Sequence, residues 1–261
     1  MRVNRKDVKG NTLKKVITRI DFEDLFGISP NVKKEIRSIA NKYNIDKQMV
    51  RFLNESDFVS DDKFSIVSYP YEYIKDIESL CFYNEELTFA IELNQLFLTI
   101  TQDVNENYLN YGITLEILSK ILNSLNIDND DLIIMKKISI KKSNAAFFES
   151  ITSMIEIFDK DNLAITMENA GDFEESMFIK KLKEEDILIN VKRIIDKGIL
   201  EGKELYRLYF EFYASNNKNI DIENVMEKIE ILNSKIFKQY ESCFTSEGIE
   251  SVKDGKKIGV I

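Results

Sequence analysis

The sequence contains no histidine, and this absence removes several kinds of chemistry from consideration. Ser-His-Asp and Cys-His nucleophile systems need an imidazole base to take the proton. The usual zinc sites draw on histidine or on clustered cysteines, and this chain has two cysteines, Cys81 and Cys243, far apart in sequence. Catalysis would therefore depend on carboxylate, lysine or tyrosine side chains. The sequence assigns no catalytic residue, no metal ligand and no cofactor.

Long apolar runs are also missing. The basic N-terminus continues into Val16-Ile17-Thr18-Arg19, whereas a secretory signal has a continuous apolar stretch after its charges. No window approaches the roughly 18 apolar residues of a membrane span. Two cysteines in apolar surroundings suit free thiols in a reducing compartment. The sequence therefore predicts a cytoplasmic protein that does not insert into a membrane.

Three motif-like segments lack the residues that would make them sites. Gly-Lys occurs at 202–203 and at 255–256, but neither pair has the upstream glycines of a phosphate-binding loop. The segment 128–131 is acidic like a calcium loop, yet the required glycine and closing glutamate are absent. We interpret all three segments as turns or loops.

Charge is divided unevenly along the chain. Residues 1–53 carry 13 Lys and Arg against six Asp and Glu, a net of +7, whereas the whole chain carries −9. The remainder, 54–261, therefore carries −16. A basic head on an acidic body favours either an anionic partner for the head or packing of the head on the body. The sequence leaves both readings open.

The first part of the chain predicts a strand followed by a helix. Apolar and polar residues alternate over 14–22, which is typical of a strand. Ser29 then precedes Pro30, a combination that suits an N-cap and the first position of a helix. A second short helix is predicted from Asp46. Residues 54–78 have no regular period.

Hairpins and long helices alternate in the rest of the chain. The patterns predict strands at 79–84, 86–93 and 95–102, a helix over 104–126, a strand at 132–141, a helix over 147–158, an acidic connector over 160–185, strands at 186–196 and 203–214, and a helix from Asp221 to about 244. Residues 245–261 show no such pattern and are expected to be loose.

The predicted fold class is α+β. A hairpin followed by a long helix occurs twice, at 86–126 and 186–244. Strands joined by short turns form antiparallel pairs, and amphipathic helices cover a sheet face. We expect one α+β domain over 1–261 with an antiparallel sheet, or two sheets, and long helices packed on it. The acidic connector would divide it into sub-halves 13–158 and 186–247.

The segment 36–53 resembles a helix-turn-helix in its spacing. Ala40 is small where two helices would approach, and Asn44 suits the turn because asparagine tolerates positive φ. A second helix capped by Asp46 would direct three side chains toward a DNA groove. These candidate nucleic-acid-binding residues are Lys47, Gln48 and Arg51. The alternative is a pair of structural helices, since the acidic remainder of the chain opposes DNA.

A group of tyrosines alternates on an extended stretch before the predicted sheet. Tyr69, Tyr71 and Tyr73 lie around Pro70. Aromatic side chains concentrate where proteins bind partners, although they also cover cores. We therefore take these three tyrosines as the candidate partner-binding residues.

The order of segments resembles a sporadically distributed family of uncharacterised bacterial proteins. The likeness rests on Leu13-Lys-Lys-Val-Ile-Thr-Arg-Ile-Asp-Phe22, the hairpin and helix at 86–126, Ile133-Ile-Met-Lys-Lys-Ile-Ser-Ile140 through Phe158, and Asn233-Ser-Lys-Ile-Phe237 with Phe244-Thr245. Segment 138–140 departs from relatives, whose strand contains more Gly and Arg. The resemblance implies a gene of mobile elements or phage defence, and no activity. It also suggests a remote architectural likeness to the export chaperone SecB, which establishes no function.

Three functions remain open from the sequence. The first is a non-enzymatic protein-binding factor, chaperone-like or acting in phage–host conflict, with a protein partner. The second is a DNA- or RNA-binding regulator that uses the basic N-terminal segment. The third is an enzyme that relies on Asp or Glu and a divalent metal.

Overall fold

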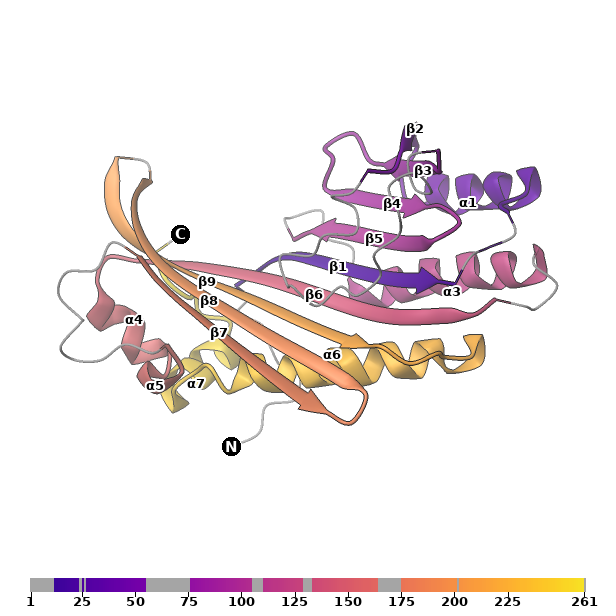
Figure 1. Ribbon diagram of the computed structural model, residues 1–261. Coiled ribbons are helices and arrows are strands. Elements are labelled where there is room, and N and C mark those ends of the chain that lie inside the picture. The colour runs from indigo at the N-terminus through magenta and orange to yellow at the C-terminus, as the bar shows by residue number, and fades with distance from the viewer. Residues whose placement is uncertain are drawn as a thin grey trace. The chain divides into compact units, whose positions relative to one another are not determined.

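The computed structural model describes residues 12–23, 25, 27–54, 76–104, 110–128, 133–163, 175–200 and 202–260 (Figure 1). In chain order the elements are β1 (Leu13–Phe22), α1 (Pro30–Lys42), β2 (Lys47–Phe52), β3 (Glu78–Tyr83), β4 (Phe89–Leu93), β5 (Phe97–Asp103), α3 (Tyr111–Asp128), β6 (Met135–Phe148), α4 (Ile151–Ile157), α5 (Lys160–Leu163), β7 (Glu175–Glu184), β8 (Ile187–Leu200), β9 (Lys203–Asn216), η3 (Ile222–Asn224), α6 (Val225–Glu241) and α7 (Ser246–Asp254).

The predicted α+β class is confirmed, and the described strands form one sheet rather than two. Nine strands are hydrogen-bonded in the order β2-β3-β4-β5-β1-β6-β9-β8-β7. The pairs β2–β3, β3–β4, β4–β5, β7–β8 and β8–β9 are all antiparallel. Two strands therefore have only one neighbour among the described strands: β2 at one end of the order and β7 at the other.

The chain divides into two compact units. Of the described residues, 12–16, 139–217 and 227–260 belong to one, here the C-terminal unit. The N-terminal unit contains 17–138 and 218–226. This division differs from the expected sub-halves. The chain passes from the N-terminal unit to the C-terminal unit within β6, between residues 138 and 139, well before the predicted connector begins at residue 160.

The start of α1 is the one the sequence predicts. Ser29 is the N-cap, and its hydroxyl accepts a hydrogen bond from the Val32 N–H at 3.3 Å, with Pro30 at the first helical position. Val32, Ile36 and other apolar residues of the helix are buried. The helix ends before Asn44, whose positive φ of 59° matches the predicted turn.

The hairpin between β4 and β5 is held by one asparagine. The Asn94 Oδ1 atom accepts hydrogen bonds from the N–H groups of Leu96 and Phe97, at 2.8 and 2.9 Å. Its Nδ2 atom donates to Ser79 Oγ at 3.1 Å. Asn94 is fully buried, so these bonds satisfy a side chain that would otherwise be costly to desolvate.

The C-terminal unit is built on the long hairpin of β8 and β9. The two strands pair from Ile187↔Asn216 to Leu200↔Lys203. Alternate residues on one face are buried, and the inward-facing positions of α6 are buried as well; in Figure 1, α6 runs along β7, β8 and β9. These inward residues are Ile187, Ile189, Val191, Leu208, Phe210, Phe212, Ile229, Leu232 and Ile236.

The prediction of a loose tail after residue 244 was wrong. Residues 246–254 form α7, whose N-cap Thr245 accepts a hydrogen bond from the Gly248 N–H at 3.0 Å. The Phe244 ring lies 4.6 Å from the Phe158 ring, centroid to centroid. A Cβ at Gly248 would come 2.1 Å from the Ile157 carbonyl oxygen, so α7 packs closely on α4. This contact is between distant segments, and the local sequence does not reveal it.

The predicted acidic connector over 160–185 was also wrong in part. Residues 160–163 form α5, and 175–184 form β7, which pairs with β8 along its whole length.

Among the described residues, no helix is both long and apolar enough to cross a membrane.

Candidate functional site

The candidate partner-binding tyrosines Tyr69, Tyr71 and Tyr73 lie outside the described residues. Their predicted role therefore stays a prediction.

The predicted second helix of the helix-turn-helix is a strand. Residues 47–52 form β2, which pairs antiparallel with β3 from Lys47↔Tyr83 to Phe52↔Glu78. The Ile45 N–H donates a hydrogen bond to the Ala40 carbonyl oxygen at 2.9 Å, and the helix does not continue beyond this turn. Residues 47–52 suit a strand because apolar side chains such as Met49, Val50 and Phe52 are well tolerated in a sheet. The backbone of β3 supplies the hydrogen bonds that pair with them.

Two of the three candidate nucleic-acid-binding side chains have partners within the protein. The Arg37 Nε atom on α1 donates to Gln48 Oε1 at 3.0 Å. Arg51 forms an ion pair with Glu92, which also accepts a hydrogen bond from Ser79 Oγ at 2.5 Å. Lys47, the third, is exposed at the start of β2. The structure does not bring these side chains to a helix face.

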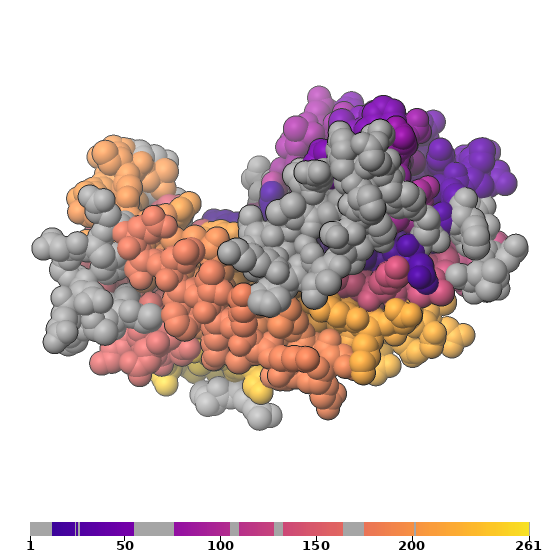
Figure 2. Space-filling model, viewed as in Figure 1, coloured from indigo at the N-terminus to yellow at the C-terminus, as the bar shows by residue number. Residues whose placement is uncertain are grey.

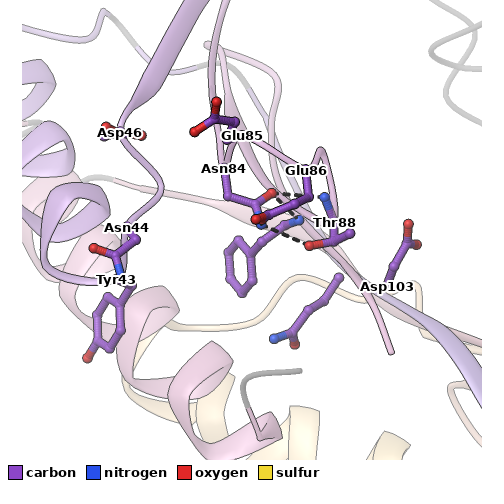
Figure 3. Close-up of a pocket in the computed structure, with 10 residues that line it drawn as sticks. Tyr43, Asn44, Asp46, Asn84, Glu85, Glu86, Thr88 and Asp103 are labelled. Carbon is purple, nitrogen blue, oxygen red and sulfur yellow. Dashed lines mark hydrogen bonds between the residues drawn. The ribbon is translucent and has the colours of Figure 1, made fainter. Parts of the chain in front are cut away.

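A polar pocket of about 440 Å³ opens where α1 leads into β2. Its lining residues come from the α1–β2 link, the β3–β4 turn and the end of β5. They are Tyr43, Asn44, Asp46, Asn84, Glu85, Glu86, Thr88, Phe89, Gln102 and Asp103 (Figure 3).

The turn on one side of this pocket is organised by Asn84. Its Oδ1 atom accepts from the Thr88 and Phe89 N–H groups at 2.8 and 2.9 Å. Its Nδ2 atom donates to Glu86 Oε2 at 3.0 Å and to Thr88 Oγ1 at 2.8 Å, as Figure 3 shows. Leu87 adopts a positive φ of 57° at the tip of this turn. The bonds made by Asn84 therefore fix the direction of Glu86.

The pocket carries four carboxylates, those of Asp46, Glu85, Glu86 and Asp103. No group of three acidic or sulfur ligands in the described residues is arranged to hold a metal ion. The charge of this lining suits an organic cation or a basic side chain. Solvated acidic groups on turns are common, however, so the four carboxylates alone define no activity.

Tyr43 ties this pocket to a charged network between α1 and α3. Lys42 Nζ lies 3.4 Å from both the Tyr43 hydroxyl and Glu116 Oε1, and Lys120 Nζ lies 2.6 Å from the same Glu116 atom. Hydrogen bonds, first from Lys120 and then from Tyr43, lower the pKa of Glu116 to about 2. The network fixes the end of α1 beside α3.

Both thiols are free and poorly suited to reaction. Burial raises the pKa of Cys243 to about 11, and its Sγ donates to the Gln239 carbonyl at 3.2 Å. Cys81 is half-buried on β3, where burial and then the nearby Glu92 carboxylate raise its pKa. Nucleophilic attack requires the thiolate, so neither cysteine is activated.

The edge strand β7 exposes three consecutive apolar side chains. Met177, Phe178 and Ile179 are 58%, 36% and 48% exposed, although they lie within a strand that is fully paired on its other side with β8. β7 crosses the front of the view in Figure 1, and its side chains form part of the surface in Figure 2. Exposed apolar residues on a sheet edge are characteristic of strands that pair with another chain.

Phe178 is held in position by a buried arginine. The Arg193 guanidinium carbon lies 5.4 Å from the centre of the Phe178 ring, and the two residues are directly opposite each other in the pairing of β7 with β8. Arg193 is 2% exposed and donates to the Asn162 carbonyl oxygen on α5. Because the hydrogen bond to α5 fixes the Arg193 guanidinium, the Phe178 ring that lies against it is held in one position.

Sequence reasoning missed this strand because its charged residues were assigned to the acidic connector. A usable signal was present: Met177-Phe178-Ile179 is an apolar run followed by Lys180 and Lys181. Apolar residues bounded by lysines are typical of edge strands.

Comparisons with known proteins do not assign a family. No family model and no curated protein matches the chain. Among solved structures, the chain is similar to the di-domain ARO/CYC StfQ from the steffimycin biosynthetic pathway. The two are 7% identical, the match covers 92% of this chain and 97% of that chain, and the TM-score is 0.17. A TM-score this low carries no argument about fold or function.

Proposed function

We propose that the protein is a non-enzymatic protein-binding factor that captures an extended segment of another polypeptide along β7. The observation that carries this proposal is the exposure of Met177, Phe178 and Ile179 on a strand at the end of the sheet order. An added strand would pair its backbone with the outward edge of β7 and cover these side chains. Capture of extended segments is the chemistry of a chaperone-like factor.

The two faces of β7 suggest the chemistry of the segment. On one face Met177 and Ile179 precede Lys181 and Lys183, and on the other Phe178 precedes Lys180, Leu182 and Glu184. From Met177 to Lys183 the first face therefore changes from apolar to basic, whereas the second stays mixed. A matching segment has apolar side chains at one end and acidic side chains at the other, and this polarity sets the direction in which it binds.

A synthetic peptide tests the proposal directly. We choose fluorescein-labelled Ile-Val-Ile-Thr-Glu-Thr-Asp-Glu and measure its binding to the full chain by fluorescence anisotropy. Ile179→Lys adds a charge to the apolar part of the edge and should weaken binding at least tenfold. Ile199→Lys is the matched control, because Ile199 is an exposed isoleucine on β8, 79% exposed, in the same unit.

Two further results discriminate strand capture from general charge attraction. The peptide with the same composition in reversed order should bind more weakly, since its acids would meet Met177 and Phe178. Binding should fall with salt but persist, because backbone pairing and apolar contact do not depend on ionic strength. Equal binding by the wild type, Ile179→Lys and Ile199→Lys would remove the proposal.

A further inference from the structure

A groove of about 400 Å³ lies between α6 and the adjoining ends of β7 and β8. All the residues that line it belong to the C-terminal unit, and Figure 1 shows the length of α6 that runs beside these strands. Cavities of this size commonly hold small organic ligands. The groove is therefore a candidate binding site in its own right, on the helix side of the sheet.

The middle of the groove is apolar and its two ends carry opposite charges. Ile231 of α6 and Ile189 of β8 supply the apolar side chains. Glu227 lies one helical turn before Ile231, and Lys238 lies two turns after it, on the same face of the helix. At about 1.5 Å per residue, the path from Glu227 to Lys238 covers roughly 16 Å along the helix axis.

The charges at the two ends lack counter-charges within the protein. Glu184 of β7 forms an ion pair with Lys235. The pKa of Glu184 is lowered mainly by Lys235 and also by the charge of Lys238, so the Lys238 ammonium lies near this pair. Along the stretches of chain that the structure describes, neither Lys238 nor Glu227 forms an ion pair. A ligand with one cationic end and one anionic end would supply both missing partners.

The separation of the two charges sets the length of such a ligand. An extended peptide spans at most about 3.6 Å per residue, so four residues reach about 14 Å between the terminal ammonium and the terminal carboxylate. This length matches the roughly 16 Å between the two ends of the groove once an ion-pair distance is added. A dipeptide spans at most about 7 Å and reaches only one end.

We infer that the groove binds short peptides of about four residues with free termini, the ammonium at Glu227, the carboxylate at Lys238 and an apolar side chain on Ile231. This activity is independent of strand capture along β7, because it uses charges on α6 and needs no strand pairing. The ion pairs are partly exposed to water, so binding is expected to be weak and to fall as salt is added.

Peptide titration of the full chain, followed through the backbone amide resonances of α6, tests the inference. The probe is Ala-Ile-Ala-Ala with free termini. It should shift resonances within 225–241 and leave those of β2 unchanged. Ala-Ile, which can reach only one end, should bind about fivefold more weakly.

Capped peptides identify each contact separately. Amidation of the carboxylate should weaken binding to the wild type about threefold and should have no effect on binding to Lys238→Met. Acetylation of the ammonium should behave in the same way toward Glu227→Gln. Lys228→Met is the matched control, since Lys228 is on the same helix but does not line the groove, and this variant should still prefer the free carboxylate.

Either of two results would overturn the inference. One is the absence of any shift in α6 with Ala-Ile-Ala-Ala at millimolar concentration. The other is amidation that weakens binding equally in the wild type and in Lys238→Met, which would place the carboxylate elsewhere. Ile179→Lys on β7 should bind the tetrapeptide as the wild type does, so failure of strand capture and failure of this site are distinguishable. Circular dichroism of each variant confirms that the fold is retained.

Discussion

Arg37 on α1 donates a hydrogen bond from Nε to Gln48 Oε1 on β2, at 3.0 Å. A side chain that spacing had assigned to a DNA groove is instead held by the helix that precedes it. The bond joins the outer strand of the sheet to α1 and orders the segment 43–47 between them.

The Arg51–Glu92 ion pair should couple β2 to β4 energetically. Both side chains are largely shielded, with 27% and 21% exposed. In a double-mutant cycle with Arg51→Met and Glu92→Gln, we expect a coupling of about 0.5–1.5 kcal/mol, between the values of exposed and buried pairs. Urea unfolding of the four proteins provides the measurement. A coupling indistinguishable from zero would show that β2 is not anchored in this way.

Gly248 should not tolerate a side chain. A Cβ there would meet the Ile157 carbonyl oxygen at 2.1 Å, so Gly248→Ala must displace α7 from α4. We expect a loss of about 1–3 kcal/mol in the free energy of unfolding.

Gly198→Ala is the matched control for this change. Gly198 lies on β8 with nothing within 4 Å of the added atom, so its stability should stay the same or rise by up to about 1 kcal/mol. Equal stability of the two alanine variants in urea would contradict the close packing of α7.

The two thiols should differ in reactivity. Cys243 is fully buried, with a pKa raised to about 11, whereas Cys81 is half-buried. At pH 8 a chromogenic disulfide reagent should modify native Cys81 slowly and Cys243 far more slowly, and both rapidly in urea. The variants Cys81→Ser and Cys243→Ala assign each phase. Rapid modification of native Cys243 would show that the core around it opens.

Glu116 should make stability depend on pH in the acid range. Its folded pKa of about 2 lies below the ordinary value of 4.5, mainly because Lys120 donates to it. The carboxylate therefore stabilises the fold fully above about pH 4.5, and this contribution disappears as pH falls toward 2.

The variant Glu116→Gln isolates this effect. It should be less stable than the wild type at pH 7, with the difference shrinking between pH 4.5 and 2 in urea titrations. Glu35→Gln, an exposed acid on α1, is the control and should show no such convergence. A constant difference across this range would mean that Glu116 acts through packing rather than charge.

Elements with a strong local signal could be predicted from the sequence. Ser29-Pro30 marks the start of α1, and the alternation in β8 and β9 gives both strands and the buried face. Asn94 identifies the β4–β5 turn because its short side chain can bond two N–H groups that follow it. In each case the cause lies within a few residues of the element.

The errors have non-local causes. Residues 47–52 have a composition that suits either a helix or a strand, and pairing with β3, more than twenty residues later, decides between them. α7 depends on the contact of Gly248 with Ile157. The candidate site on β7 was hidden because an edge strand needs few buried residues and so shows little apolar periodicity.

Hydrogen exchange at β7 is the measurement that tests strand capture most directly. The full chain is exchanged with and without the peptide Ile-Val-Ile-Thr-Glu-Thr-Asp-Glu, and amide protection is followed by mass spectrometry or NMR. Strand addition predicts slower exchange at the outward N–H groups of 175–184, and no such change in Ile179→Lys. Peptide binding that leaves β7 exchange unaltered, or that protects another part of the chain instead, would contradict the account.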